Sequence, residues 1–276
     1  MSLRDDTKAL LERHGLYAKK RFGQNFLVDA GVVADIADAA LHNADLRVIE
    51  VGPGLGTLTR ALLARGAEVR AIEKDDSLLP ILREELAGEK LSIVSADALK
   101  VDFRQIYGPG VKPTIAGNIP YNISSPLLMQ LIAHREVIGP VTLMVQKEVA
   151  DRWMAKPGTK TYGSPSIMLQ VFAEIDRVRG VPPQCFVPPP KIDSMVVRLD
   201  WLPQPRVPVP DPVHFEKTVR TAFSQRRKTL RNSLKTGFEP EQIQRAEAVL
   251  DLQRRAETLS LAEMSVLAEA LSALKS

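Results

Sequence analysis

The sequence is poor in the features that mark secreted and membrane proteins. It has a single cysteine, Cys185, so no disulfide can form within the chain. The opening stretch MSLRDDTKAL has acids where a signal peptide would have basic and then apolar residues. No apolar run approaches the ~20 residues that a membrane span needs. We therefore expect a cytoplasmic protein in a reducing compartment, without a membrane partner and, by default, monomeric.

Acids are also missing from two stretches that are rich in lysine and arginine. The net charge of +4 permits a polyanionic partner without requiring one. However, residues 217–235 contain no acid, and none occurs between Glu12 and Asp29. Charged side chains usually lie on a solvated surface, but clusters of lysine and arginine without acids favour contact with phosphates. The residues predicted to make such contacts are Lys19, Lys20, Arg21, Arg220, Arg226, Arg227, Lys228 and Arg231.

From residue 46 onward, short apolar runs alternate with amphipathic stretches. The pattern predicts strands over 46–51, 67–73, 91–97, 113–118 and 141–146, and helices over 57–66, 76–86 and 124–135. Such alternation indicates parallel strands joined by right-handed crossovers, hence an α/β doubly wound, Rossmann-like sheet. Residues 173–181 and 194–202 come closer together and predict an antiparallel pair at one edge. Asp76 is the expected N-cap of the second helix.

A proline-rich stretch separates this region from a helical tail. Residues 203–212 hold five prolines in ten positions, which is typical of an extended linker. We therefore predict two domains, 1–205 and 206–276, the second small and all-α. Apolar residues recur there at helical spacing, namely Val219, Phe223, Leu230 and Leu234. Ser260 and Glu263 form a capping box at the start of the last helix.

Three glycines, Gly52, Gly54 and Gly56, follow the first predicted strand. They could form a tight turn that binds no ligand, but three glycines in five residues exceed what a turn needs. The dinucleotide fingerprint is G-x-G-x-x-G, whereas the spacing here is G-x-G-x-G, which favours S-adenosylmethionine (SAM). Glu73 and Asp97 end the next two strands. They could accept hydrogen bonds from the hydroxyls of a ribose and the amine of an adenine, respectively. Either could instead cap a neighbouring element.

The fourth strand ends in Asn118-Ile-Pro-Tyr121. The nitrogen of an adenine amine is a poor nucleophile, because its lone pair is delocalised into the ring. Acceptors from Asn118 and a carbonyl of Ile119–Pro120 could favour a tetrahedral nitrogen, with Pro120 fixing the turn. Tyr121 could stack on the base. No metal is required. Taken alone, the tetrapeptide fits an Asx-turn with a half-buried tyrosine equally well.

Together, the motifs resemble the ribosomal RNA adenine dimethyltransferase family. The segments that carry the resemblance, in the family's order, are KKRFGQNFLVD (19–29), EVGPGLGTLT (50–59), Glu73, Asp97, NIPY (118–121), FVPPPKIDSMV (186–196) and FSQRRKTLRNSL (223–234). They span nearly the whole chain. The resemblance implies a seven-stranded SAM-dependent methyltransferase fold, the last strand inserted antiparallel, and a helical C-terminal domain that docks on RNA.

The resemblance also implies a reaction and roles for single residues. Methyl groups would pass from SAM to N6 of two adjacent adenosines near the 3′ end of 16S rRNA, during assembly of the 30S subunit. The cofactor-binding residues would be Asn25, Leu27, Gly52, Gly54, Glu73, Asp97 and Asn118. The catalytic residues would be Asn118, Pro120, Tyr121 and Phe186, with Phe186 stacking opposite Tyr121. From the sequence alone, Phe186 fits a core aromatic slightly better.

Three other functions remain open. An Erm-type enzyme that dimethylates adenine in 23S rRNA shares the glycine loop and a similar N-I-P-Y motif. A non-catalytic RNA-binding assembly factor could keep the fold, although intact Glu73, Asp97 and Asn118 argue against a degenerate enzyme. A nicotinamide oxidoreductase is disfavoured by the glycine spacing.

Overall fold

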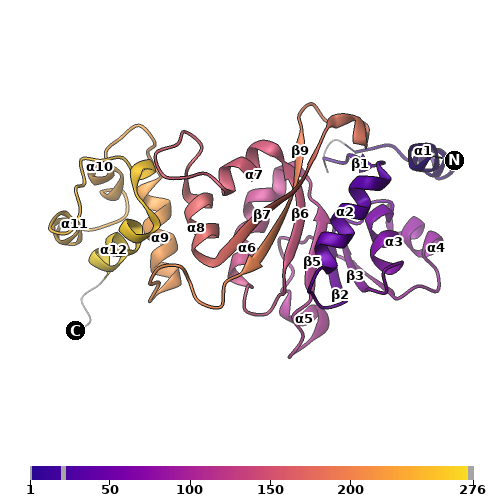
Figure 1. Cartoon of the computed structure of the whole chain (residues 1–276), viewed down its shortest axis with the longest axis horizontal. Helices are drawn as coiled ribbons and strands as arrows, with labels where there is room; N and C mark the ends of the chain where they lie inside the picture. The colour runs from indigo at the N-terminus through magenta and orange to yellow at the C-terminus, as the bar shows by residue number, and fades with distance from the viewer. Residues whose placement is uncertain (1, 20–22, 273–276) are drawn as a thin grey trace. The chain divides into compact units, whose positions relative to one another are not determined.

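The computed structural model describes residues 2–19 and 23–272, which are drawn as a ribbon in Figure 1. Strands and helices alternate through the first part of the chain, and its last part is helical. Within the described residues, no helix is long and apolar enough to cross a membrane.

The described residues fall into two compact units. The first contains the chain up to Ala150 and also Ile175–Trp201. The second contains Asp151–Glu174 and the chain from Leu202 onward. This grouping by compactness puts Asp151–Glu174 with the helical tail, whereas the sequence suggests one boundary at residue 205. The division into domains therefore remains a prediction.

A seven-stranded sheet forms the centre of the first unit. Across the sheet the strands are β4 (Leu91–Ser95), β3 (Glu68–Glu73), β2 (Arg47–Val51), β5 (Thr114–Asn118), β6 (Val141–Gln146), β9 (Ser194–Trp201) and β7 (Ala173–Val181). The strands from β4 to β6 pair in parallel. β9 runs antiparallel to β6, with Val141 opposite Leu199, and is inserted between β6 and β7. The predicted α/β class with a mostly parallel sheet is confirmed.

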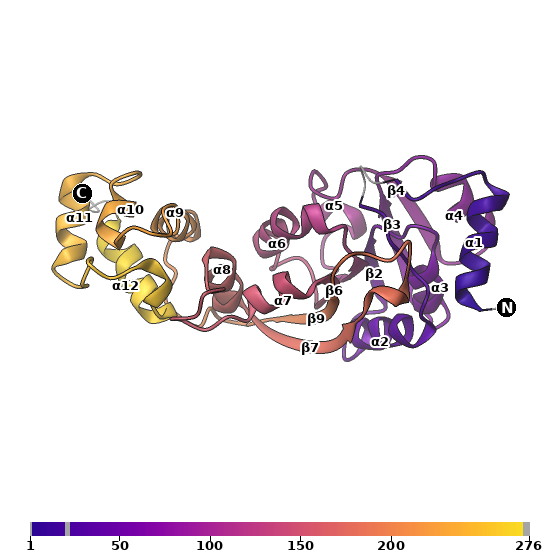
Figure 2. The same ribbon diagram turned by 90° about the horizontal axis from the view of Figure 1, so that it is seen from above.

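The central strands are buried on both faces, which explains their near-continuous apolar sequences. Val48, Ile49 and Ile115 are fully buried. Figure 2 shows why, since α2 (Ala30–Leu41) lies on one side of the sheet and α5 (Arg104–Tyr107) and α6 (Ser124–Ala133) lie on the other.

The remaining elements of the first unit are short. They are α1 (Leu3–Arg13), β1 (Phe26–Leu27), α3 (Thr57–Leu63), α4 (Leu79–Glu85), η2 (Tyr121–Ile123), η3 (Pro183–Cys185) and β8 (Phe186–Val187). α7 (Lys147–Trp153) begins in the first unit and ends in the second. β1 and β8 form a separate two-stranded antiparallel ribbon, in which Leu27 faces Phe186.

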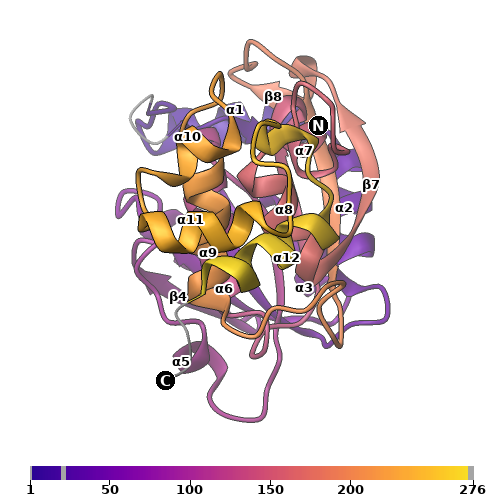
Figure 3. The ribbon, with the colours of Figure 1, turned by 90° about the vertical axis from the view of Figure 1, so that its left-hand side faces the viewer.

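The second unit is a small helical bundle, seen face-on in Figure 3. Its helices are α8 (Ser164–Phe172), α9 (Pro212–Ala222), α10 (Leu230–Leu234), α11 (Pro240–Glu247), η4 (Ala256–Thr258) and α12 (Leu261–Leu271). Val219, Leu230 and Leu234 are fully buried, as the apolar spacing predicts. Phe223 is half-buried and meets Tyr162 edge-on, with ring centroids 6.2 Å apart. The capping box at Ser260 and Glu263 is confirmed.

The start of one predicted helix is wrong. α4 begins at Leu79, and Asp76 does not cap it, because the Asp76 carboxylate accepts a hydrogen bond from the Ser95 hydroxyl at 2.6 Å. Pro80 lies in the first turn, where its missing N–H leaves no helical hydrogen bond unmade.

Candidate active site

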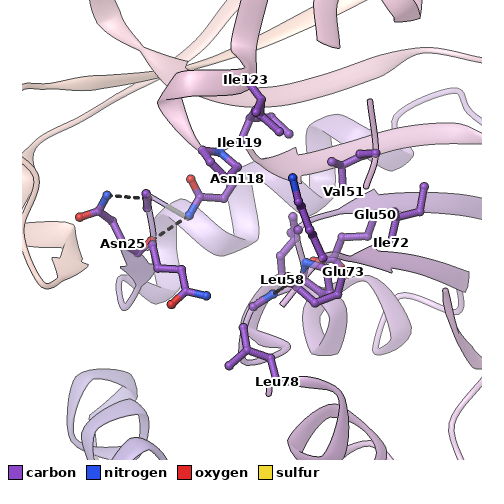
Figure 4. Close-up of a pocket in the computed structure, with 18 of the residues that line it drawn as sticks. Asn25, Glu50, Val51, Leu58, Ile72, Glu73, Leu78, Asn118, Ile119 and Ile123 are labelled. Carbon is purple, nitrogen blue, oxygen red and sulfur yellow. Dashed lines mark hydrogen bonds between the residues drawn. The ribbon is translucent and has the colours of Figure 1, made fainter. Parts of the chain in front are cut away.

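A cavity opens at the carboxyl ends of β2, β3, β4 and β5 (Figure 4). Ligands of open α/β sheets bind at this edge, because the loops that leave parallel strands converge there. The predicted site residues that line the cavity are Asn25, Leu27, Gly52, Gly54, Glu73, Asp97, Asn118, Pro120 and Tyr121. The fold therefore brings together residues that lie up to about a hundred positions apart in the sequence.

The glycine loop between β2 and α3 needs its glycines for conformational reasons. Gly52, Gly54 and Gly56 have φ of +70°, +60° and +80°, a region that other residues rarely adopt. The N–H of Gly54 donates to Oε2 of Glu73 at 3.2 Å. The loop backbone is thus exposed to the cavity on one side and tied to the neighbouring strand on the other.

Glu73 ends β3 as a buried carboxylate. It is only 8% exposed, and its Oε1 accepts from the N–H of Asp75 at 2.8 Å. Burial raises its pKa, although backbone hydrogen bonds oppose the shift. A carboxylate has about four acceptor positions, so each oxygen of Glu73 can accept a further donor from a ligand.

Asp97 follows β4 and remains charged. Its Oδ2 lies 2.8 Å from Nζ of Lys74, and its Oδ1 accepts from the N–H of Leu99 at 3.1 Å. The hydrogen bond from Lys74 holds the pKa of Asp97 below its usual range. Lys74 also lines the cavity, a contribution that the sequence did not indicate.

Asn118, the last residue of β5, has its side-chain amide oriented by a hydrogen bond. The Nδ2 group donates to the main-chain carbonyl of Asn25 at 3.1 Å, a contact marked in Figure 4. Among the described residues, no donor reaches Oδ1. The amide is therefore held by its nitrogen, and its oxygen remains available as an acceptor.

The residue before Asn118 explains how β5 reaches the glycine loop. A Cβ added at Gly117 would lie 2.5 Å from the carbonyl oxygen of Val51, at the end of β2. Only glycine fits at this distance. After Asn118, the N–H of Ile119 donates to the carbonyl of Met144 at 3.1 Å, and Pro120 leads into a 3₁₀ turn. The motif is therefore anchored on both sides.

Of the two predicted aromatic residues, only Tyr121 reaches the described lining of the cavity. Its hydroxyl lies 2.8 Å from Oγ of Ser194. Burial raises the pKa of Tyr121, so the phenol is neutral near pH 7. Phe186 is 1% exposed and packs in the hydrophobic core beside Leu27. Its predicted stacking on a base therefore remains a prediction.

Glu50 is a cavity residue that the sequence analysis missed. It lies within β2, is 1% exposed, and its Oε2 has no hydrogen-bond partner among the described residues. Burial, reinforced by the nearby charge of Glu73, raises the pKa of Glu50 to about 8. The sequence does contain a signal for Glu50, namely an acid inside an otherwise apolar strand. A polar group buried there needs a partner, which indicates a site.

Of the basic residues near the N-terminus that are predicted to contact phosphate, the structure describes Lys19. Lys20 and Arg21 lie outside the described residues. Nζ of Lys19 lies 2.8 Å from Oδ1 of Asp75 and 2.6 Å from Oγ of Ser77. Lys19 is thus already paired inside the first unit, and its main-chain N–H donates to Gln24, which lines the cavity.

The basic cluster of the helical unit is more exposed. Arg226, Arg227 and Lys228 are all exposed. The Arg226 guanidinium donates to the main-chain carbonyl of Lys160, which brings a second basic segment against the cluster. Neither Arg227 nor Lys228 forms an ion pair within the described part of the chain. These side chains therefore present positive charge to solvent.

Two further predicted residues have acidic neighbours. Arg220 lies 3.6 Å from Glu216, and Arg231 lies 3.1 Å from Glu247. Both arginine side chains are largely exposed, and exposed pairs contribute little stability. Either guanidinium could exchange its carboxylate for a phosphate.

Comparison with known proteins agrees with this geometry. The family model described as ribosomal RNA adenine dimethylase matches residues 15–272. The ribosomal RNA small subunit methyltransferase A of Magnetococcus marinus is 47% identical over 95% of this chain and 94% of its own. The protein of the same name from Clostridium acetobutylicum is 41% identical over 96% of this chain and 97% of its own.

Two solved structures are similar over most of the chain. A dimethyladenosine transferase from Plasmodium falciparum has a TM-score of 0.70 at 26% identity and covers 88% of this chain and 95% of its own. The 23S rRNA methyltransferase ErmE has a TM-score of 0.65 at 29% identity and covers 90% and 99%.

Proposed function

We propose, from the premise that the chain belongs to the ribosomal RNA adenine dimethylase family, that it is a SAM-dependent methyltransferase acting on N6 of adenosine in small-subunit rRNA. In finer detail, the substrate would be two adjacent adenosines in the 3′-terminal hairpin of 16S rRNA, each receiving two methyl groups. The enzyme would act as a monomer in the cytoplasm during assembly of the 30S subunit.

The polar groups of the cavity suit SAM. The buried Oε2 of Glu50 has no described partner, and Glu73 lies beside it. SAM has both a sulfonium and an ammonium group, and a positive charge placed beside Glu50 would lower its raised pKa and favour the ionised carboxylate. The N–H groups of Gly52, Gly54 and Gly56 already donate within the protein, so other N–H groups of the loop would donate hydrogen bonds to its carboxylate.

The other cofactor contacts follow the strand ends. We assign the ribose hydroxyls to Glu73 and the adenine amine to Asp97. Leu27 and Asn25 would cover the bound molecule from the segment before α2, and Gly52 would face its methionine part. When bound, SAM supplies an electrophilic methyl group on a positively charged sulfur.

The roles at the target base rest on the orientation of Asn118. Oδ1 of Asn118 and the carbonyl of Ile119 would accept the two N–H bonds of N6, which directs the nitrogen lone pair away from the ring. With its lone pair so directed, N6 would take up the methyl group that bound SAM supplies, and one N6 proton would leave to solvent. Pro120 holds both acceptors in place.

Tyr121 would hold the ring of the target base. A neutral phenol offers a flat face for stacking, and that face also favours the positive charge that develops on nitrogen. To stack opposite Tyr121, Phe186 would have to leave its packing in the hydrophobic core.

The helical unit would supply RNA affinity. Arg226, Arg227 and Lys228 form its exposed basic cluster, to which Lys160 adds a neighbouring charge. Phosphate contacts of this kind position a protein on RNA without reading its sequence, which leaves selection of the adenosines to the cavity.

The orientation of Asn118, held by Asn25 so that its oxygen stays free, is the observation that supports catalysis most directly. The test supplies SAM with a labelled methyl group and either undermethylated small-subunit particles or free 23S rRNA. We expect label in the small-subunit particles, at positions that nuclease mapping puts in the 3′-terminal hairpin.

Two other results would contradict the proposed function. Label in free 23S rRNA alone would favour the Erm-type reaction, the alternative raised by the similarity to ErmE. SAM binding without label in either RNA would favour a non-catalytic assembly factor. The higher identity of the small-subunit relatives, 41–47% against 29% for ErmE, supports the first outcome.

A further inference from the structure

One wall of the cofactor cavity is formed by residues 23–27, which precede α2. This wall segment is held at two points by interactions already described. Leu27 pairs with Phe186 in the β1–β8 ribbon, and the carbonyl of Asn25 accepts from Asn118 at 3.1 Å. Both contacts hold the downstream half of the wall segment.

The upstream half is held by a third set of contacts, all directed at Asp75. Nε2 of Gln24 donates to Oδ2 of Asp75 at 2.8 Å, and Nζ of Lys19 donates to Oδ1 at 2.8 Å. The main-chain N–H of Lys19 also donates to Oε1 of Gln24 at 2.8 Å, which fixes the Gln24 side chain against the backbone of Lys19. We call Lys19, Gln24 and Asp75 the Asp75 latch.

Asp75 is well suited to hold such a latch. It is 3% exposed, and its Oδ1 also accepts from the N–H and hydroxyl of Ser77 at 3.2 and 2.7 Å. Burial alone would raise the pKa of Asp75, but the hydrogen bonds from Lys19, Ser77 and Gln24 outweigh it and lower the pKa. The carboxylate therefore stays charged and fully partnered, as a buried charge requires.

The latch also reaches the residue proposed to bind the ribose. The main-chain N–H of Asp75 donates to Oε1 of Glu73 at 2.8 Å. Asp75 thus connects the wall segment on one side of the cavity with the carboxylate on its floor. A displacement of Asp75 would disturb both at once.

We infer that Asp75 is a positioning residue for the cofactor, which fixes the wall segment through Lys19 and Gln24 and orients Glu73. Lys19 accordingly serves the cofactor cavity rather than the RNA. This inference rests on the proposed function, because it presumes that the cavity binds SAM.

The experiment compares Lys19→Met, Gln24→Ala and Asp75→Asn with the wild-type chain. Lys19→Met keeps the aliphatic stem and removes the charge, and Asp75→Asn keeps the shape. We expect the Kd and the KM for SAM to rise by roughly ten-fold, since each variant loses a hydrogen bond to a charged group. At saturating SAM, kcat should stay within about two-fold, because the latch does not touch the reacting atoms.

A double variant tests whether the residues act as one unit. If Lys19 and Asp75 act only through each other, Lys19→Met combined with Asp75→Asn should weaken SAM binding no more than Asp75→Asn alone. The matched control is Asp38→Asn, which breaks the 2.6 Å ion pair with Arg65 in the same unit but away from the cavity. Its Kd for SAM should equal that of wild type.

Measurements of RNA binding distinguish a role of Lys19 in holding the wall segment from a role in contacting phosphate. If Lys19 contacts phosphate, Lys19→Met should lower the slope of log affinity against log salt by about 1. That result, with an unchanged Kd for SAM, would overturn the inference, as would unchanged SAM binding in both Lys19→Met and Gln24→Ala. A wild-type chain that binds no SAM would instead overturn the proposed function itself.

Discussion

At the scale of single residues, Asn118 provides the most direct test of catalysis. Asn118→Ala removes the acceptor that we assign to N6, so the rate of methyl transfer at saturating SAM should fall by roughly 100-fold, the scale seen when one preorganised polar group is lost. Single-turnover assays with labelled SAM measure this rate. A wild-type rate in a variant with an unchanged melting temperature would remove Asn118 from the mechanism.

Glu50 makes stability depend on pH in a defined direction. Its ordinary pKa is 4.5, and the folded protein raises it to about 8. Below pH 4.5 both the folded and the unfolded chain hold the proton. Between the two values the unfolded chain has lost it, so the free energy of unfolding falls by up to about 1.4 kcal/mol per pH unit. Above pH 8 this loss is complete.

Glu50→Gln removes this titration and keeps the shape of the side chain. We expect its free energy of unfolding to depend less steeply on pH between 4.5 and 8, and the variant to exceed wild type in stability toward pH 8. Urea unfolding at several pH values measures both curves. Parallel curves across this window would show that Glu50 is ionised in the folded chain.

At the scale of secondary structure elements, the contact between β5 and β2 sets the position of the N-I-P-Y motif. Gly117→Ala would put a methyl group 2.5 Å from the carbonyl of Val51. The strand must shift, so we expect the free energy of unfolding to fall by about 1–3 kcal/mol. Because the shift moves the N-I-P-Y motif, the rate of methyl transfer should fall even where the variant is still fully folded.

A glycine of β7 serves as the control for this prediction. A Cβ at Gly180 meets nothing within 4 Å, so Gly180→Ala should leave both activity and unfolding midpoint near wild type. Urea unfolding and methyl-transfer rates measure the pair. Equal behaviour of the two variants would contradict a special role for Gly117.

The sequence predicts the elements better than their contacts. Alternating apolar runs give the strands and the parallel order, and parallel strands explain why Glu73, Asp97 and Asn118 meet at one edge. The late start of α4 could not be foreseen, because it depends on a hydrogen bond from Ser95 to Asp76 across the fold.

The same limit applies to the site. The pairing of Lys19 with Asp75 joins positions 56 residues apart, so it could not be foreseen from charge clustering, and the phosphate contact of Lys19 stays a prediction. For Phe186, by contrast, the sequence alone slightly favoured a core aromatic, and the residue is buried where β8 pairs with β1. To recognise Glu50 as a buried cavity residue, one would have to know that its strand is central in the sheet.

At the scale of the whole molecule, the two units should divide binding from chemistry. Changing Arg226, Arg227 and Lys228 together to alanine should weaken RNA binding and reduce the slope of log affinity against log salt by about 1 for each lost phosphate contact. The Kd for SAM should not change, because the cavity lies in the first unit. Salt titrations and calorimetry provide the two readouts.

An unaltered salt slope in that triple variant would show that the cluster does not contact phosphate. Arg206→Ala is a suitable control, since Arg206 also lies in the second unit and pairs with Glu174. We expect its RNA affinity to remain near that of wild type.

The two buried carboxyl groups of the cavity, Glu50 and Glu73, have a consequence for turnover. Each methyl transfer removes the positive charge on sulfur, so the spent cofactor is attracted less strongly to negative charge than the fresh one. A positive charge beside these groups favours their ionised form, so we expect the cavity to bind SAM more tightly than S-adenosylhomocysteine. The four transfers proposed above would use four cofactor molecules, so weaker retention of the spent cofactor would favour turnover.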